Sequence, residues 1–239
     1  MKSASSFDLV AAIDRKIEEH HLLKHPFYRA WTAGRLSRES LALYAEQYYQ
    51  HVKAFPGYLQ RLANRTQGEL RETVEDNLQE ELHPAGPHPK LWRDFAASLG
   101  VEDAALDSVQ TLPGVEALIR TYSDLTEKGS FAEAVTALYA YEAQVPEIAA
   151  QKIDGLRRFY NITEPAALRY FSVHQEADVR HRAAWRDWLA KQPEARCVIP
   201  SEARNLPFAA RPIVAAADRS LKALWGALDA VYPEPCASN

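Results

Sequence analysis

The feature that most limits the possible folds is one predicted helix that carries three metal-ligand residue types on a single face. The segment covers about residues 165–191, with Thr163 as the expected N-cap, and contains His174, Asp178 and His181. At 3.6 residues per turn, these three side chains fall within an arc of roughly 60°. Two imidazoles and one carboxylate on one face can bind iron, manganese or zinc. The pattern also fits a polar helix face in solvent, so other segments have to supply further ligands before a metal site is predicted.

Nearly every other segment of the chain also predicts helix. Glycine is scarce, at 9 of 239 residues, and no alternating run is followed by a hairpin turn. A loop is expected at about 101–113, and residues 192–209 are polar and predict a linker or arm. We therefore expect an all-α fold in one domain over 1–239, a bundle of seven or more helices whose core covers 7–190. The expected helices cover about 7–23, 25–31, 37–65, 67–82, 88–100, 115–127, 131–160, 165–191 and 210–231.

Two local patterns refine this prediction. The spacing of Tyr44, Tyr48, His51 and Phe55 places an aromatic stripe along the helix over 37–65, which is typical of core packing. Ser37 is a suitable N-cap for that helix. A capping box, Ser-Phe-Ala-Glu, begins the predicted helix over 131–160.

Composition excludes several classes of protein. Lysine and arginine number 28 against 32 aspartates and glutamates, a formal charge of −4, so we expect no nucleic-acid partner. No apolar stretch approaches the ~18 residues of a membrane span, so we expect no membrane partner. The first residues hold no apolar signal core, and two cysteines, Cys197 and Cys236, make no disulfide framework, so a cytoplasmic protein is expected. Leucine and tryptophan on the final helix over 210–231 suggest an exposed dimer surface and hence a homodimer.

Further metal-ligand residue types lie on other predicted helices. Glu142 lies in an apolar, alanine-rich helix, where an unpaired carboxylate is costly to bury. Glu81 and His88 bracket a proline-rich break that lets both side chains turn toward one point. Glu80 and His83 are available as well, so spacing alone does not force the choice. Three carboxylates and three histidines suit two divalent ions in a helical bundle, and the six candidates are Glu81, His88, Glu142, His174, Asp178 and His181.

Four segments of the sequence together resemble a known family. The residues that carry the resemblance are Tyr44-Ala-Glu-Gln-Tyr-Tyr-Gln-His51, Asp76-Asn-Leu78, Leu138-Tyr-Ala-Tyr-Glu142 and His174-Gln-Glu-Ala-Asp178-Val-Arg-His181. Over about 7–189 the chain is similar to the heme-oxygenase-like (TenA/PqqC-like) diiron oxidase superfamily. Within it, the chain looks like the 4-aminobenzoate-forming group that includes the chlamydial protein associating with death domains. The resemblance implies that the six candidates are the ligands of two metal ions.

The resemblance also implies an activity. Members of this group form 4-aminobenzoate for folate synthesis in a self-sacrificing reaction that uses two metal ions, dioxygen and a reductant. The tyrosine that would be consumed matches Tyr28, the amino donor matches Lys152, and the family's site tyrosines match Tyr44, Tyr141 and Tyr170. A tyrosine side chain already holds the six-carbon ring of the product and, in Cβ, its carboxylate carbon. Converting it requires oxidation of an inert group, which fits a metal-dependent oxidoreductase that activates dioxygen.

Two alternatives remain open from the sequence. An oxidase of the same fold could act on a free small molecule, such as an amino acid or a fatty acid. A helical bundle could also be a non-enzymatic interaction module that binds no stoichiometric metal. The ligand set accepts Fe/Fe, Fe/Mn or Mn/Mn, and it leaves open whether the protein turns over once or many times.

Overall fold

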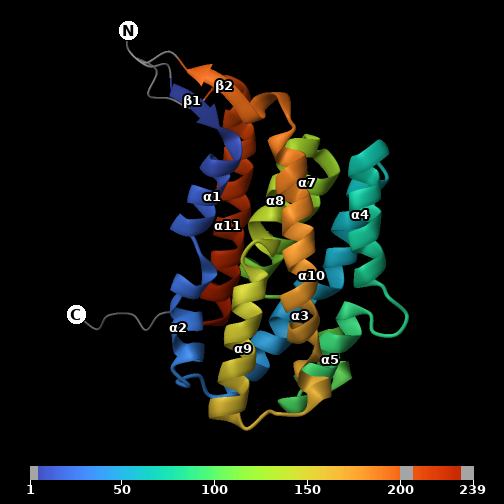
Figure 1. Ribbon diagram of the computed structural model, residues 1–239. Helices are drawn as coiled ribbons and strands as arrows, with labels where there is room; N and C mark the ends of the chain where they lie inside the picture. Colours follow the sequence, from blue (N-terminus) through green and yellow to red (C-terminus); the bar gives the residue numbers. More distant parts are fainter. Residues whose placement is uncertain (1–4, 200–206, 233–239) are drawn as a thin grey trace, which may run out of the picture.

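The structure is a computed structural model that describes residues 5–199 and 207–232. Within these residues the chain forms eleven α-helices and one pair of short strands (Figure 1). Cys236 lies outside the described residues, as does part of the 192–209 segment. The helices are α1 (Leu9–Glu19), α2 (Pro26–Thr32), α3 (Arg38–Ala63), α4 (Gly68–Glu81), α5 (His88–Ser98), α6 (Asp103–Ser108), α7 (Pro113–Lys128), α8 (Phe131–Glu142), α9 (Val145–Tyr160), α10 (Pro165–Ala190) and α11 (Arg211–Val231).

Two helix starts follow the capping signals of the sequence. Ser37 accepts a hydrogen bond from the backbone N–H of Ser40 at 3.1 Å and begins α3. Ser130 and Glu133 form the predicted capping box at the start of α8. The start of α10 differs from its prediction, because Glu164 rather than Thr163 is the N-cap residue, and no side chain caps it. Pro165 still lies in the first turn, where its missing N–H has no helical partner to lose.

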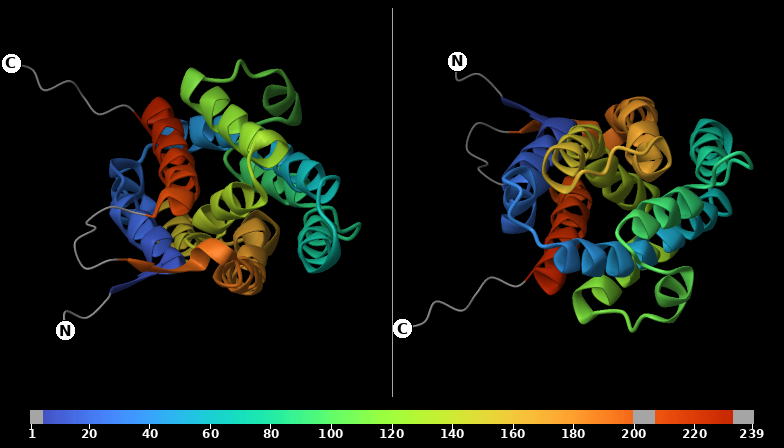
Figure 2. Two further views of the ribbon diagram at one scale, coloured as in Figure 1. Left: turned by 90° about the horizontal axis from the view of Figure 1, so that it is seen from above. Right: turned by 90° about the horizontal axis from the view of Figure 1, so that it is seen from below.

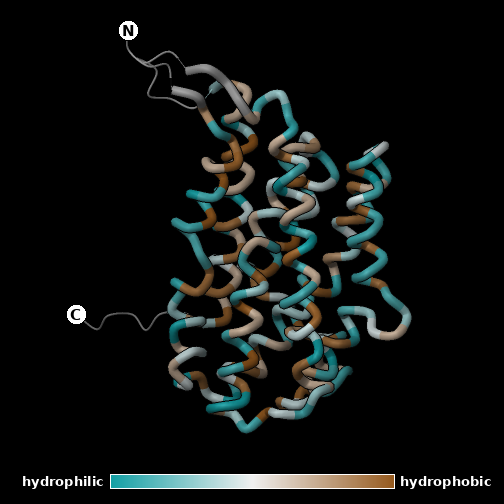
Figure 3. The backbone as a smooth tube through the Cα atoms, viewed as in Figure 1, coloured by the Kyte–Doolittle hydropathy of each residue, from teal (hydrophilic) through white to brown (hydrophobic). Residues whose placement is uncertain are grey.

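The helices pack around one apolar core. α11 lies along α7 and α8 and also contacts α1, while α10 packs against α9, α5 and α8 (Figures 1 and 2). α3 crosses the bundle and contacts α7, α4 and α5. The hydrophobic residues gather on the inner sides of the helices, and the outer sides are hydrophilic (Figure 3). No helix within 5–199 and 207–232 is both long and apolar enough to cross a membrane.

The apolar side of α11 belongs to this core. Leu221, Leu224 and Leu228 are buried, and the half-buried Trp225 donates its indole N–H to the backbone oxygen of His20 at 2.6 Å. The expectation of an exposed surface on the final helix is therefore wrong, because an apolar helix face covers its own core as readily as a partner. A homodimer remains a prediction that needs another surface.

Two predicted boundaries are also wrong. The single helix expected over 131–160 is two helices, α8 and α9, which meet at Ala143 and Gln144. Pro146 lies in the first turn of α9, where proline is tolerated. Glu142 is therefore the last residue of α8 and not a mid-helix residue. The loop expected at 101–113 contains the short helix α6.

A short antiparallel strand pair was not expected. β1 (Ser5–Asp8) pairs with β2 (Arg196–Ile199), with Phe7 opposite Cys197. The pair joins the start of the chain to the segment after α10, part of the stretch predicted as a linker or arm (Figure 1). Neither segment, Ser-Ser-Phe-Asp or Arg-Cys-Val-Ile, strictly alternates apolar and polar residues, so the strand pattern is missing from both.

Candidate metal centre

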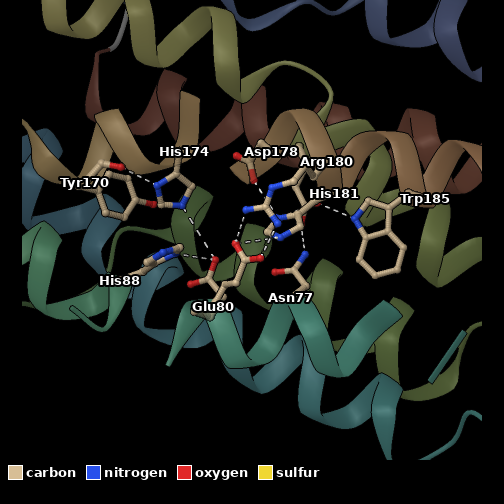
Figure 4. Close-up of polar contacts among 11 residues, drawn as sticks. Asn77, Glu80, His88, Tyr170, His174, Asp178, Arg180, His181 and Trp185 are labelled. Atoms are coloured by element: carbon tan, nitrogen blue, oxygen red, sulfur yellow. Dashed lines mark hydrogen bonds and ion pairs between the residues drawn. The ribbon is translucent and has the colours of Figure 1, made fainter. Parts of the chain in front are cut away.

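Three helix ends and one continuous helix face bring the six candidate ligands together. Glu81 and Glu142 are the last residues of α4 and α8, and His88 is the first residue of α5. α10 supplies the other three from one face, as its periodicity predicted (Figure 4). All six side chains are buried, and they form two groups of three: Glu81, His88 and His174, and Glu142, Asp178 and His181.

In the first group, the possible ligand atoms lie within 4.8 Å of one another. Oε1 of Glu81 is 2.9 Å from Nδ1 of His88 and 3.9 Å from Nε2 of His174. The centroids of the His88 and His174 imidazole rings are 4.4 Å apart. Nδ1 of His88 makes no hydrogen bond in spite of the short distance, so these atoms face a common point rather than each other. This is the arrangement that a bound cation would satisfy.

The second group is built in the same way. Nδ1 of His181 lies 3.2 Å from Oδ1 of Asp178 and 3.9 Å from Oε2 of Glu142. Oδ2 of Asp178 is buried and has no hydrogen-bond partner. Buried polar atoms are rarely left without a partner, so this group also fits a divalent ion.

Neighbouring side chains and backbone orient these ligands. Nδ1 of His174 lies 2.6 Å from the backbone oxygen of Tyr170, so its N–H donates there and Nε2 is left free to face Glu81. Glu142 accepts a hydrogen bond from Nδ2 of Asn77 at 3.0 Å and one from the indole N–H of Trp185 at 2.5 Å (Figure 4). Local sequence patterns do not predict Asn77 or Trp185 as partners of Glu142, because the two residues lie on α4 and α10.

The ionisation of Glu142 and His181 also fits a site for a cation. Burial raises the pKa of Glu142 to about 8. Burial lowers the pKa of His181, but its hydrogen bond to Asp178 and the nearby carboxylates outweigh this and raise the pKa to about 9. Without a cation, the second group therefore holds protons at neutral pH, whereas a divalent ion would stabilise the ionised carboxylates instead.

The structure also decides which of the neighbouring candidates, Glu80 or Glu81 and His83 or His88, face the site. Glu81 and His88 point into the bundle with His174. Glu80 is half-buried and forms an ion pair with Arg180, and His83 is exposed. Adjacent residues on a helix point about 100° apart, so only the packing of α4 decides which carboxylate faces inward.

A small, largely enclosed cavity of about 10 Å³ is lined by residues of both groups. Its volume is close to that of one water molecule. His51 also lines it, is fully buried, and has no hydrogen-bond partner at Nε2. Burial lowers the pKa of His51 to about 3, so this imidazole is neutral. The aromatic stripe predicted for α3 is core packing, and two members of it, His51 and Phe55, also border the candidate metal centre.

A second cavity of about 20 Å³ is lined by four of the five remaining predicted site residues, and the fifth, Tyr44, lies directly behind it. Tyr28 and Lys152 line it together with the candidate ligand His174, and both are buried. Tyr141, Tyr170 and His174 line both cavities. The surroundings of Tyr28 and Lys152 are therefore continuous with the metal-ligand groups.

Lys152 lies among aromatic rings. Its Nζ is 2.6 Å from the hydroxyl of Tyr44, and that hydroxyl is 3.5 Å from the hydroxyl of Tyr28. Burial lowers the pKa of Lys152 to about 7, and no carboxylate among the described residues contributes to this shift. A large part of the population then carries a neutral amine at physiological pH, which is the nucleophilic form.

Comparison with known proteins places this chain in a family. The model of a family described as iron-containing redox enzymes matches residues 42–218, which include all six candidate ligands. The chain belongs to this family. It is 39% identical over 236 residues to the 4-aminobenzoate synthase of Nitrosomonas europaea, covering 95% of this chain and 92% of that protein. It is 36% identical to the 4-aminobenzoate synthase of Chlamydia pneumoniae, covering 75% and 80% of the two chains.

Solved structures agree about the fold of this member of the iron-containing redox enzymes. A TenA homologue from Pseudomonas syringae aligns with a TM-score of 0.76 at 16% identity, covering 93% of this chain and 90% of that one. A CADD-like protein from Nostoc punctiforme aligns with a TM-score of 0.66 at 19% identity, covering 92% and 98%. The all-α, heme-oxygenase-like fold and the oxidoreductase class are therefore confirmed, and the non-enzymatic interaction module is not supported.

Proposed function

We propose that this enzyme forms 4-aminobenzoate from its own Tyr28 side chain, with Lys152 as the amino donor. The reaction would use dioxygen and a reductant at two divalent metal ions held by the two ligand groups. The observation that carries the proposal is that Tyr28, Lys152 and the ligand His174 line one closed cavity of about 20 Å³. The curated relatives named 4-aminobenzoate synthase support the product.

The size of the cavity favours an internal substrate. Pockets that bind small molecules usually measure about 300–1,000 Å³. The two cavities at the candidate site measure about 10 and 20 Å³, too little for a free amino acid or fatty acid. A ring that is already part of the core needs no such space. The free-substrate oxidase would require the bundle to open substantially.

The chemistry divides into two changes. Cutting Cα–Cβ of Tyr28 and converting Cβ to a carboxylate is an oxidation, for which dioxygen is the oxidant. Exchanging the para hydroxyl for an amine leaves the ring at the same oxidation level: Nζ of Lys152 forms a bond to the ring carbon, and the hydroxyl leaves as water. The Cε–Nζ bond of Lys152 must then break, which balances if dioxygen oxidises this linkage to an imine and water hydrolyses it to the aromatic amine and an aldehyde at Cε. When bound, the metal ions would supply the activation of dioxygen.

The chain's own residues would prepare Tyr28 for these changes. Tyr44 holds Lys152 through a hydrogen bond of 2.6 Å and lies next to the Tyr28 hydroxyl. The buried aromatic surroundings lower the pKa of the amine to about 7, so that a large part of the population is neutral at physiological pH. Tyr141 and Tyr170 line both cavities and would relay electrons between the metal-ligand groups and Tyr28.

Isotope labelling tests the proposal. Protein made with ring-labelled tyrosine is loaded anaerobically with Fe(II) and Mn(II) and then given dioxygen and a reductant. We expect labelled 4-aminobenzoate at no more than one per chain, and a peptide in which Tyr28 has lost its side chain. Tyr28→Phe should give no product, whereas Tyr122→Phe, another buried tyrosine, should remain active.

Two other outcomes would contradict the proposal. Unlabelled product from an undamaged chain would show that the precursor is a free molecule. Neither product nor mass change, with both metals bound, would point to the free-substrate oxidase.

A further inference from the structure

Glu80 lies beside the candidate ligand Glu81 but has a different set of partners. Its carboxylate accepts two parallel hydrogen bonds from the Arg180 guanidinium, with Nη1–Oε1 at 2.8 Å and Nη2–Oε2 at 3.0 Å (Figure 4). Such a bidentate pair fixes the plane and position of the carboxylate. Glu80 is therefore held rigidly although it is only half-buried.

The same carboxylate faces the second metal-ligand group. Oε2 of Glu80 lies 3.4 Å from Nε2 of His181. Nε2 is buried and makes no well-aligned hydrogen bond. The other ring nitrogen, Nδ1, faces Asp178 and Glu142. His181 thus lies between the ligand group on one side and Glu80 on the other.

We propose that Glu80 is a positioning residue for the Glu142, Asp178 and His181 metal site. This inference rests on the proposed dimetal function. Its carboxylate accepts the N–H of His181 at Nε2, so that Nδ1 is unprotonated and aimed at the metal. A carboxylate in this position fixes the tautomer and raises the basicity of a ligand histidine. Arg180 keeps Glu80 in place.

The two sites then differ in what supports their histidines. In the Glu81, His88 and His174 group, His174 donates to the neutral backbone oxygen of Tyr170. In the other group, His181 would donate to the carboxylate of Glu80, which lies 3.4 Å from its Nε2. The second site should therefore bind a divalent ion more tightly than its three ligands alone would, and the two sites need not have the same metal preference.

Glu80 and Arg180 also lie in the wall of two open surface clefts. One cleft of about 380 Å³ is lined by His181, and another of about 260 Å³ is lined by His88. Glu80, His83 and Arg180 line both. Because the pair lies at the surface and not in the core, it can be substituted without disturbing the packing of the bundle.

The test uses the full-length protein and Co(II) alone, titrated anaerobically with visible absorbance as the readout. Asp178→Ala and His174→Ala identify which binding step belongs to which site. For Glu80→Gln we expect the step at the second site to weaken 10–100-fold while the first site is unchanged. Arg180→Ala should weaken the same step less, and Glu80→Asp should restore part of the affinity.

A matched control comes from the same helix. Arg71 and Glu75 of α4 form an exposed ion pair at 2.8 Å with no link to either ligand group. Glu75→Gln and Arg71→Ala should leave both Co(II) steps unchanged. Two unchanged binding constants in Glu80→Gln would overturn the positioning role and leave the dimetal function standing. A wild-type protein that binds no Co(II) would overturn both.

Discussion

The Nζ atom of Lys152 lies 2.6 Å from the hydroxyl oxygen of Tyr44, surrounded by aromatic rings instead of carboxylates. The rings of Phe171 and Tyr28 have their centroids 5.2 and 5.4 Å from that nitrogen. Aromatic faces attract a cation only moderately, and they replace the water that an ammonium group prefers. The position therefore favours the neutral amine that the proposed transfer of nitrogen requires.

Lys152→Met should remove the proposed activity but make the fold more stable. The pKa of Lys152 is about 7 in the folded protein and ordinarily about 10.4 when unfolded. Between these values the unfolded chain binds a proton that the folded chain does not, so wild-type stability rises with pH across this window. At pH 7 the substitution should raise the free energy of unfolding by on the order of 2 kcal/mol, after loss of the hydrogen bond to Tyr44.

Urea unfolding of the metal-free protein at pH 7 and pH 10 checks this prediction. The gain from Lys152→Met should shrink at pH 10, where the unfolded lysine also begins to lose its proton. Lys53→Met, at an exposed lysine of α3, should change stability little at either pH. If Lys152→Met lowers the free energy of unfolding at both pH values, burial of the Lys152 amine does not destabilise the wild-type fold, and the prediction is wrong.

Metal binding at pH 7 should release protons. The pKa values of Glu142 and His181, about 8 and 9, mean that both groups are protonated in the metal-free protein. Ligation needs the unprotonated forms, so we expect about two protons to be released when both sites fill, and affinity to rise with pH. Calorimetric titration with Mn(II) in buffers of different ionisation enthalpy measures this number.

Glu142→Gln should release fewer protons than the wild type in the same titration, because one titrating ligand is gone. Glu116→Gln, on the exposed side of α7, should release the same number as the wild type. Heats that do not depend on the buffer would contradict the protonated state of the metal-free site.

His51→Phe should flatten the acid side of the stability curve of the metal-free protein. The pKa of His51 is about 3 when folded and ordinarily about 6.5 when unfolded. As pH falls below about 6.5, the unfolded chain binds a proton that the folded chain cannot, so stability is lost by about 1.4 kcal/mol per pH unit from this residue. Unfolding at pH 7, 6 and 5 should show this difference in slope.

Phe55→Leu serves as the control for this slope. It lies on the same stripe of α3 and does not titrate, so it should lower stability by a similar amount at each pH. Equal slopes for the wild type and His51→Phe would mean that His51 accepts a proton inside the fold.

Two helical glycines should respond to alanine in opposite directions. A Cβ at Gly155 of α9 would lie 2.7 Å from Cδ1 of Trp31, whereas a Cβ at Gly226 of α11 would meet no atom within 4 Å. Gly226→Ala should therefore raise the free energy of unfolding by about 0.5–1 kcal/mol, the usual helix effect. Gly155→Ala should lower it by about 1–3 kcal/mol because the core is overpacked there. Thermal unfolding of both variants checks the two signs.

Trp31 gives the Gly155 substitution a second consequence. Its indole N–H donates to the backbone oxygen of Lys152 at 3.3 Å. A ring displaced by the new methyl group would disturb the support of Lys152 as well as the packing of α2 on α9. If the Gly155→Ala variant is as stable as the Gly226→Ala variant, the Trp31 indole moves aside at no cost in stability.

The sequence predicted those parts of the site that lie on one helix or beside a strong local signal. The three candidate ligands of α10 share one face because 3.6-residue periodicity fixes their direction. The proline-rich break predicted that Glu81 and His88 could converge, but Glu80 was an equal candidate until the packing of α4 was known. The contacts of Asn77 and Trp185 with Glu142 depend on three different helices, which no local pattern records.

The errors in the fold have the same origin. The alanine-rich segment through Glu142 favours helix, and Pro146 is compatible either with a kinked helix or with the first turn of a new one. Tertiary packing selects the second, which places Glu142 at a helix end beside the ligands of α10. The apolar face of α11 was assigned to a partner because its pattern does not say which surface it covers.

The burial of Tyr28 has a consequence for the life of the molecule. Only 2% of its surface is exposed, and its ring packs against Phe27 in the apolar core. A chain that had given up this ring would keep a void of the kind that lowers stability by about 3–5 kcal/mol, against a typical total of about 5–15 kcal/mol. Spent copies would unfold more often and be cut by proteases sooner than fresh ones. The same event that yields the product would then mark the used chain for removal, and the supply of product would follow the rate of protein synthesis.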